Sequence, residues 1–156
     1  MDNLKRTLLV VDDEEDICEM LADTAKQDGY NVLIAKDGTE ALAILRAEKV
    51  DAVLTDLMMP NMNGSELIMR TRALGRATPF VLVSGVNDDS AVIGAFRSGA
   101  CDFPPKPFTT EILRSVVNRV LDIGARLNTV DSLLDRLAEE NTEIADQVDK
   151  IRRQQQ

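Results

Sequence analysis

The stretch LLVVDD, residues 8–13, decides the fold class of this chain. Its four apolar residues have the character of a buried strand, and two carboxylates follow at once. Two further runs repeat this arrangement, because AVLT (residues 52–55) precedes Asp56 and FVLV (residues 80–83) precedes Ser84. Open parallel sheets bind ligands beyond the carboxyl ends of their strands. The sequence therefore predicts that these polar groups meet in one crevice.

Strand-like and helix-like segments alternate up to about residue 122. Strands are predicted at residues 7–11, 31–35, 51–55, 79–83 and 100–103. Helices are predicted at residues 14–28, 38–47, 65–74, 88–98 and from about 109 onward. This alternation is typical of right-handed βαβ units and a mostly parallel sheet, here a doubly wound domain of three layers. Pro104 and Pro105 place the fifth strand at an edge, since proline cannot donate to a strand ladder.

Two details concern the first helix and its end. Ile17, Met20, Leu21 and Ala25 are expected on its inner face, and Gly29 is expected to supply the left-handed residue that ends it.

Composition limits the classes of function. The chain has 156 residues, 44% of them hydrophobic, which is enough for one domain with a core and a modest appendage. The net charge of −9 argues against direct nucleic-acid binding by this chain. We find neither an apolar run of roughly 18 residues, as a membrane span needs, nor a signal peptide. Cys18 and Cys101 read as reduced core residues, so a cytoplasmic location is expected.

The C-terminal segment has a different periodicity. Apolar residues recur at alternating steps of three and four, with Asn141 as the polar exception. Position a holds Leu127, Leu134, Asn141 and Val148, and position d holds Val130, Leu137, Ile144 and Ile151. About four heptads of this kind indicate a coiled coil. The phase continues backward to residue 113, so we expect one α/β domain over 1–122 and a coiled-coil helix over 123–156 that continues from the fifth helix. Gly124 is the weak point, at a cost of about 1 kcal/mol relative to alanine.

The coil predicts self-association through residues 124–156, with a fold-back onto the domain as the alternative. Asn141 at an a position favours a parallel dimer. Leucine at a with isoleucine at d favours tetramers by the same rule, so both states stay open.

The polar groups of the crevice suit phosphoryl chemistry. Asp12, Asp13 and Asp56 offer hard oxygen ligands, which Mg²⁺ prefers, and Mg²⁺ usually completes its shell with phosphate oxygens. Asp56 would be the nucleophile that forms an acyl phosphate. Lys106 would offset the charge of the transferring group, and Ser84 would donate a hydrogen bond to it.

Each of these residues also has an ordinary structural interpretation. Residues 12–15 could begin a helix, Asp56 and Ser84 could lie in turns, and Lys106 could be a solvated lysine. The joint interpretation is stronger because all four elements occur in order, each at the end of a strand.

The chain resembles the receiver domain of a two-component response regulator. The resemblance rests on residues 9–14 (LVVDDE), 54–64 (LTDLMMPNMNG), 83–85 (VSG) and 102–108 (DFPPKPF), and covers roughly residues 5 to 122. It implies a flavodoxin-like, five-stranded parallel sheet of order 2-1-3-4-5 with helices on both faces, followed here by a long C-terminal helix.

The resemblance also implies roles at the metal site. Asp56 resembles the phosphoacceptor, and Asp13 the direct Mg²⁺ ligand with Asp12 assisting. The backbone carbonyl of Met58 resembles a further protein ligand.

A second group of residues resembles the family's switch. Ser84 and Lys106 match its phosphate-sensing pair. Phe103 stands where an aromatic side chain reorients, and without a hydroxyl it would switch by packing alone.

The implied function is a signalling switch rather than an enzyme, beyond self-catalysed phosphoryl transfer to Asp56 and slow autodephosphorylation. The phosphoryl group would come from a phosphohistidine of a sensor histidine kinase or phosphotransfer protein. The state would pass through the coil, as a homodimer, to an output not present in this chain.

Three alternative functions fit the sequence less well than the switch. A Mg²⁺-dependent aspartyl-phosphate phosphatase of the haloacid dehalogenase type needs an aspartate two residues after the nucleophile, where this chain has Met58. Flavin binding on the same topology needs a Ser/Thr-rich first loop to hold the flavin phosphate, and this chain does not have one. A coil-driven scaffold with a silent receiver would not need the complete acidic site.

Overall fold

The computed structural model describes residues 5–83, 90, 93, 94, 97, 99, 100 and 109–154, with residues 127–131 described by their backbone alone. The chain divides into two compact units, Met1–Gly124 and Ala125–Gln156, and each is considered by itself below.

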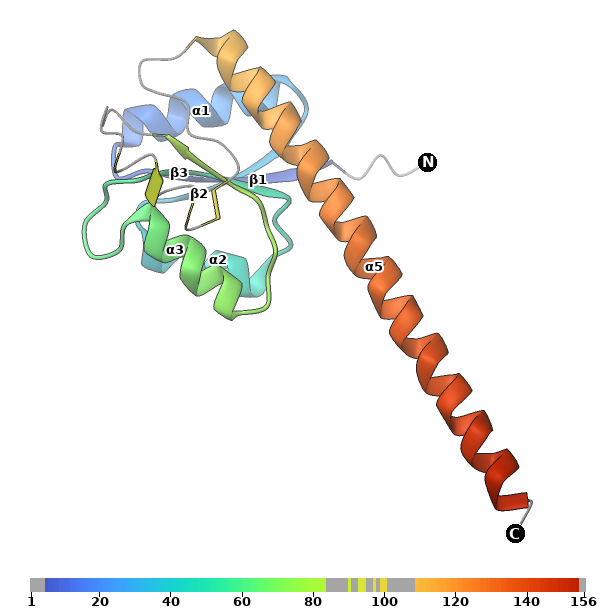
Figure 1. Cartoon of the computed structure of the whole chain (residues 1–156). Helices are drawn as coiled ribbons and strands as arrows, with labels where there is room; N and C mark the ends of the chain where they lie inside the picture. Colours follow the sequence, from blue (N-terminus) through green and yellow to red (C-terminus); the bar gives the residue numbers. More distant parts are fainter. Residues whose placement is uncertain are drawn as a thin grey trace. The chain divides into compact units, whose positions relative to one another are not determined.

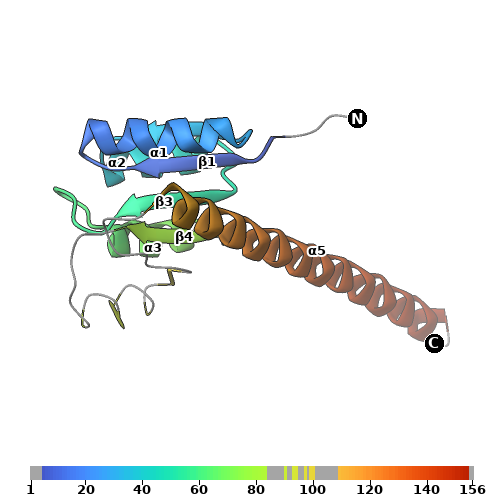
Figure 2. The same ribbon diagram turned by 90° about the horizontal axis from the view of Figure 1, so that it is seen from above.

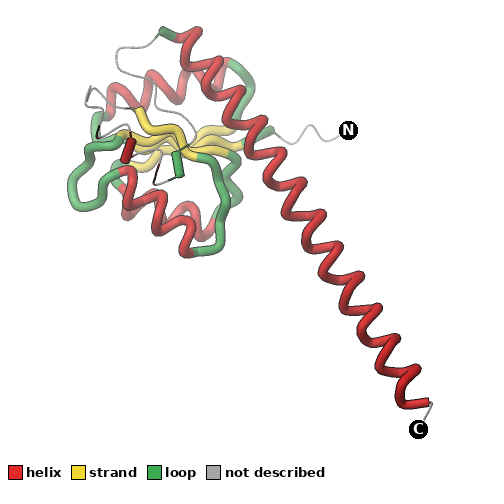
Figure 3. Tube along the Cα trace, viewed as in Figure 1, coloured by secondary structure: helices red, strands yellow, loops and turns green. Residues whose placement is uncertain are grey.

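Strands and helices alternate in the first unit, in the sequence shown in Figures 1 and 3. The strands are β1 (Thr7–Val11), β2 (Asn31–Ala35), β3 (Ala52–Asp56) and β4 (Phe80–Val83). The helices are α1 (Glu15–Gln27), α2 (Gly38–Ala47), α3 (Gly64–Ala73) and α5 (Thr110–Gln154), the last of which runs on into the second unit.

The sheet is parallel throughout and has the order β2-β1-β3-β4 over its four described strands. This agrees with the predicted doubly wound α/β fold. The predicted fifth strand, residues 100–103, falls almost wholly outside the described residues, as does most of the predicted helix at 88–98.

Helices cover both faces of the sheet. Figure 1 shows α1 on one face and α2 with α3 on the other, and Figure 2, seen from above, shows β1, β3 and β4 following one another. Alternate residues of β1 enter different cores: Leu9 and Val11 pack in the cluster on the α2–α3 side, and Leu8 and Val10 in the cluster with α1 and α5. This alternation is the period of two that a pleated strand imposes.

Two predicted details were wrong. The third strand is shifted by one residue, because Asp56 pairs with Val83 and belongs to β3, whereas Asp51 accepts the Thr7 N–H through its side chain at 2.7 Å. Met20 is 50% exposed, and the inner face of α1 consists of Cys18, Leu21, Ala22 and Ala25. Gly29 has the expected positive φ of 90°.

The first part of α5 belongs to the core of the first unit. Its buried residues are Leu113, Val116, Val117, Val120 and Leu121. Gly124 is buried as well, and a Cβ there would lie 3.1 Å from Pro79 Cγ and 3.3 Å from the Asp51 carbonyl oxygen. The glycine that breaks the helix-forming pattern therefore provides close packing against the start of β3 and β4.

The second unit continues α5, and the large apolar side chains that the structure describes in it are not buried. The large ones, Leu133, Leu134, Leu137, Ile144, Val148 and Ile151, are between 40% and 58% exposed. None of the helices in the described part of the chain combines the length and apolar character of a membrane span.

Candidate functional site

Asp12 lies directly beyond β1 and is held by its neighbours. Its side chain is 3% exposed, and Oδ1 accepts the Glu14 N–H at 3.0 Å. Its backbone N–H donates to the Ala35 carbonyl of β2 at 3.2 Å. The helix N-cap of α1 is Glu14, which makes no side-chain cap bond, and the acidic Glu15 and Asp16 form part of its first turn. Asp13, next in the chain, is exposed.

Asp56 is the last residue of β3 and is 9% exposed. Its Oδ1 accepts the Met58 N–H at 3.2 Å, which orients the carboxylate against the loop that follows the strand. Its backbone carbonyl accepts a hydrogen bond from the Thr55 hydroxyl at 3.0 Å.

The structure brings the three predicted aspartates together. One carboxylate oxygen from each of Asp12, Asp13 and Asp56 lies within 4.8 Å of the others. Carboxylates this close, two of them buried, repel one another unless a cation or proton offsets their charge. An all-oxygen donor set with one exposed member fits a hard divalent cation that keeps several waters, as Mg²⁺ does. The residues present therefore fit the metal that the sequence predicts.

A hollow of about 280 Å³ adjoins the aspartates on the β2 side. It is lined by Asp12, Asp13, Glu15, Cys18, Glu19, Ile34 and Lys36. The N-terminus of α1 begins beside it, and the positive end of the helix dipole favours negative charge there.

Cys18 lies in the core, as predicted. The thiol is 3% exposed and donates to the Asp12 carbonyl oxygen at 3.2 Å. Burial, reinforced by the Asp12 carboxylate, raises the pKa of this thiol, so it stays protonated and unreactive. Its role is to support the backbone of Asp12.

The remaining predicted site residues are less completely seen. Ser84, Phe103 and Lys106 lie outside the described residues. Met58 is described: its backbone faces Asp56 through the hydrogen bond above, and its side chain is 63% exposed.

Two neighbours of the site were missed by sequence reasoning. Lys36, at the end of β2, lines the hollow beside the aspartates. Gly64 packs so closely that a Cβ there would lie 2.7 Å from the Asp56 carbonyl oxygen. The position of Lys36 one residue after a strand is the signal that could have indicated it, as it did for Asp12 and Ser84.

Comparison with known proteins gives a consistent result. The family model described as the response regulator receiver domain matches residues 8–118. The chain is 35% identical over 131 residues to the DNA-binding response regulator MtrA of Mycobacterium tuberculosis, with 84% of this chain and 54% of that protein covered. It is 34% identical over 114 residues to the response regulator MprA of Mycolicibacterium vanbaalenii, with 73% and 49% covered.

Solved structures agree in fold. The chemotaxis protein CheY4 of Vibrio cholerae superimposes with a TM-score of 0.71 at 30% identity, covering 74% of this chain and 98% of that one. A receiver domain protein from Methanospirillum hungatei gives a TM-score of 0.74 at 25% identity, covering 78% and 98%.

The chain spans about half the length of the curated relatives it matches. The matched part is the α/β domain that carries the three aspartates. This chain belongs to the response regulator receiver domain family.

Proposed function

We propose that this chain stores a phosphoryl group on Asp56 and signals through its C-terminal helix. The observation that carries the proposal is the convergence of Asp12, Asp13 and Asp56 at the carboxyl ends of β1 and β3. Family membership supports it, because receiver domains are phosphorylated signalling switches.

In the proposed reaction an Asp56 carboxylate oxygen attacks the phosphorus of a phosphohistidine on a sensor kinase or phosphotransfer protein. The new P–O bond forms as the donor's P–N bond breaks, and the leaving imidazole nitrogen keeps the electron pair. The Met58 N–H orients the nucleophile, because its hydrogen bond fixes Asp56 Oδ1 and so positions the second carboxylate oxygen, Oδ2, to attack.

Asp12, Asp13 and Asp56, with the Met58 carbonyl, would hold Mg²⁺. When bound, the ion supplies positive charge that offsets the carboxylates and the phosphoryl oxygens. Lys106 and Ser84, in their predicted roles, would add a cation and a hydrogen-bond donor for the phosphoryl group.

We do not propose turnover of external substrates. Met58 stands two residues after Asp56, where an acid would be needed to protonate a leaving group, and its thioether cannot donate a proton.

Incubation with Mg²⁺ and acetyl phosphate, read by intact mass, tests the proposal. The parent protein should gain one phosphoryl group per chain, and Asp56→Ala should gain none. Thr55→Val serves as a matched control, because it alters the neighbouring buried residue without removing the nucleophile. A phosphoryl adduct that persists in Asp56→Ala would contradict the assignment.

For the second unit we propose a homodimer formed along residues 124–156. Of the six large exposed apolar residues, all except Leu133 fall on the a and d positions of the predicted coil. An isolated helix of this kind gains little stability by itself, whereas each buried leucine or isoleucine contributes roughly 1.5–3 kcal/mol. Asn141 would face its equivalent in a parallel pair.

We assign no output domain or effector to this chain. The curated relatives MtrA and MprA are about twice as long as the matched region, and MtrA is named for DNA binding. For this chain, with its net charge of −9, we keep the prediction that it makes no direct nucleic-acid contact.

A further inference from the structure

The loop of residues 57–63 joins the proposed phosphoacceptor to α3. It begins at Asp56 and carries Met58, whose N–H fixes the Asp56 carboxylate at 3.2 Å. Although the loop lies at the surface, three of its side chains are buried in the core cluster on the α2–α3 side: Leu57, Met59 and Met62. The loop is therefore held by packing at several points along its length.

One of these points is the contact between Met62 and Gly38. Gly38 is the buried first residue of α2, and Met62 is 7% exposed. A Cβ on Gly38 would lie 2.7 Å from Met62 Sδ and 2.9 Å from its Cβ and Cγ. Real Cβ atoms do not come this close to another heavy atom, so the methionine side chain occupies the space that any other residue at position 38 would fill.

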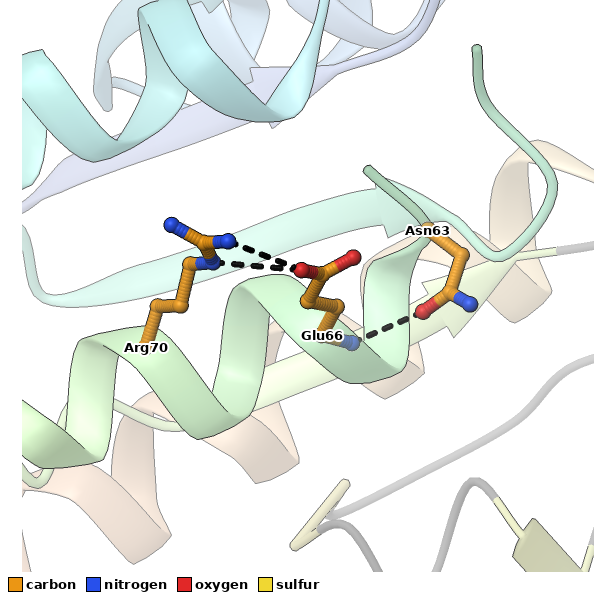
Figure 4. A network of polar contacts seen from close by, with 3 residues as sticks. All are labelled: Asn63, Glu66 and Arg70. Atoms are coloured by element: carbon orange, nitrogen blue, oxygen red, sulfur yellow. Dashed lines mark hydrogen bonds and ion pairs between the residues drawn. The ribbon is translucent and has the colours of Figure 1, made fainter. Parts of the chain in front are cut away.

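The far end of the loop is fixed by the start of α3. The Gly64 N–H donates to the Leu57 carbonyl at 2.9 Å, which closes the loop on itself. A Cβ on Gly64 would lie 2.6 Å from Leu82 Cδ2 as well as against the Asp56 carbonyl. Figure 4 shows how α3 begins: Asn63 Oδ1 accepts the Glu66 N–H at 2.8 Å, and Glu66 Oε1 accepts from Arg70 Nη2 at 3.0 Å.

We propose that Met62, seated on Gly38, is a positioning residue for the phosphoryl site. It acts through the loop backbone, because anchoring residue 62 limits how far Met58 can move from Asp56. The inference rests on the proposed function, since it concerns the same aspartates. Met62 itself would touch neither the phosphoryl group nor the metal. The geometry of the site would also depend on the first turn of α2, where Gly38 lies.

The first test measures Mg²⁺ affinity by calorimetry and the rate of phosphoryl uptake from acetyl phosphate, in the full chain. Met62→Ala should weaken Mg²⁺ binding and slow uptake, each by roughly tenfold, as loss of an outer support of a metal site does. Met62→Leu keeps the buried volume and should stay within about twofold of the parent on both measures.

A control separates positioning from simple destabilisation. Leu45→Ala opens a cavity in the same core cluster, two helical turns along α2 from Gly38. It should lower the unfolding temperature while leaving Mg²⁺ affinity at the parent value. If Leu45→Ala weakens Mg²⁺ binding as much as Met62→Ala does, the role of Met62 is structural only and the inference is wrong.

A double-mutant cycle assigns the effect to the contact itself. Gly38→Ala should weaken Mg²⁺ binding because its methyl group displaces Met62. Combined with Met62→Ala, the same methyl group no longer meets Sδ and Cγ and clashes only with the Cβ of residue 62, so the double variant should lose less Mg²⁺ affinity than the sum of the two single losses. If the losses of Mg²⁺ affinity in the two single variants add up in the double variant, the Met62–Gly38 contact is not the cause of the effect.

The outcomes distinguish the two proposals. A parent protein that takes up no phosphoryl group would refute the proposed function. A parent that is phosphorylated normally, together with Met62→Ala at unchanged Mg²⁺ affinity and rate, would refute the inference alone.

Discussion

The two units of this chain treat the same residue types in opposite ways. In the first unit, leucines and valines on both faces of the sheet are almost fully buried under helices. In the second unit, leucines and isoleucines at heptad spacing are about half exposed. Both stretches of α5 carry apolar residues at steps of three and four. The spacing of apolar residues therefore determines which face of a helix is apolar, whereas that face is buried only where a second surface packs against it.

Removing residues 125–156 breaks the comparison most strongly. The shortened chain should be monomeric, because the exposed seam is gone, and should accept a phosphoryl group at the parent rate, because the aspartates and their supports all lie before Gly124. Light scattering and intact mass would check the two halves of this prediction. A shortened chain that still dimerises would place the interface in the first unit.

A matched pair of leucine truncations gives the next largest effect. Leu67→Ala removes a fully buried side chain of α3 and should cost about 2–5 kcal/mol in the free energy of unfolding of the first unit. Leu134→Ala, at a position 58% exposed, should leave that free energy unchanged and weaken self-association instead. Urea unfolding followed by circular dichroism, with dilution series for association, measures both. Equal costs for the two variants would mean that the seam is already buried in a single chain.

Two glycines sharpen the comparison on a smaller scale. Gly94 is helical with open space at its Cβ position, so Gly94→Ala should stabilise the chain by up to about 1 kcal/mol. Gly124→Ala meets Pro79 and the Asp51 carbonyl and should lose that gain. Thermal unfolding of the two variants side by side checks the prediction; a similar rise for both would show that α5 does not pack tightly at Gly124.

The smallest effect concerns the polar contacts of α5 in the first unit. Arg114 Nε lies 2.9 Å from Asp28 Oδ2, and the Tyr30 hydroxyl donates to Asn118 Oδ1 at 2.8 Å. Because the ion pair is largely exposed, Arg114→Ala should cost no more than about 1 kcal/mol, and less at high salt. Denaturant titrations at two salt concentrations would measure this. A larger loss, independent of salt, would mean that the Arg114 stem contributes packing.

The order of strands and helices could be predicted from the sequence because hydrophobic runs and turn residues are local signals. β1, β2 and α2 have the predicted bounds to the residue. The shift of β3 could not be predicted, since the pairing of Asp56 with Val83 depends on a strand nearly thirty residues away. Met20 was predicted on the inner face of α1 because it lies near Ile17 around the helix, but it is half exposed, since the width of the buried face depends on the packing partners and not on the helix alone.

Some residues of the candidate site could be predicted from the sequence and others could not. Asp12, Asp13 and Asp56 could be predicted from their place after strands, and the structure gathers them. Lys36 could have been indicated by the same position after a strand, whereas the Met62–Gly38 contact could not, because it joins two segments that are unrelated in sequence. Supports of a site come from tertiary contacts, for which a single sequence offers no periodic signal.

Native mass spectrometry of the chain after incubation with Mg²⁺ and acetyl phosphate reports phosphorylation and self-association in one spectrum. We expect a species of twice the 17.2 kDa chain mass with one phosphoryl group on each chain, and no phosphoryl group in Asp56→Ala. A phosphoryl group retained in Asp56→Ala, or a parent chain that stays monomeric and unmodified, would contradict this expectation.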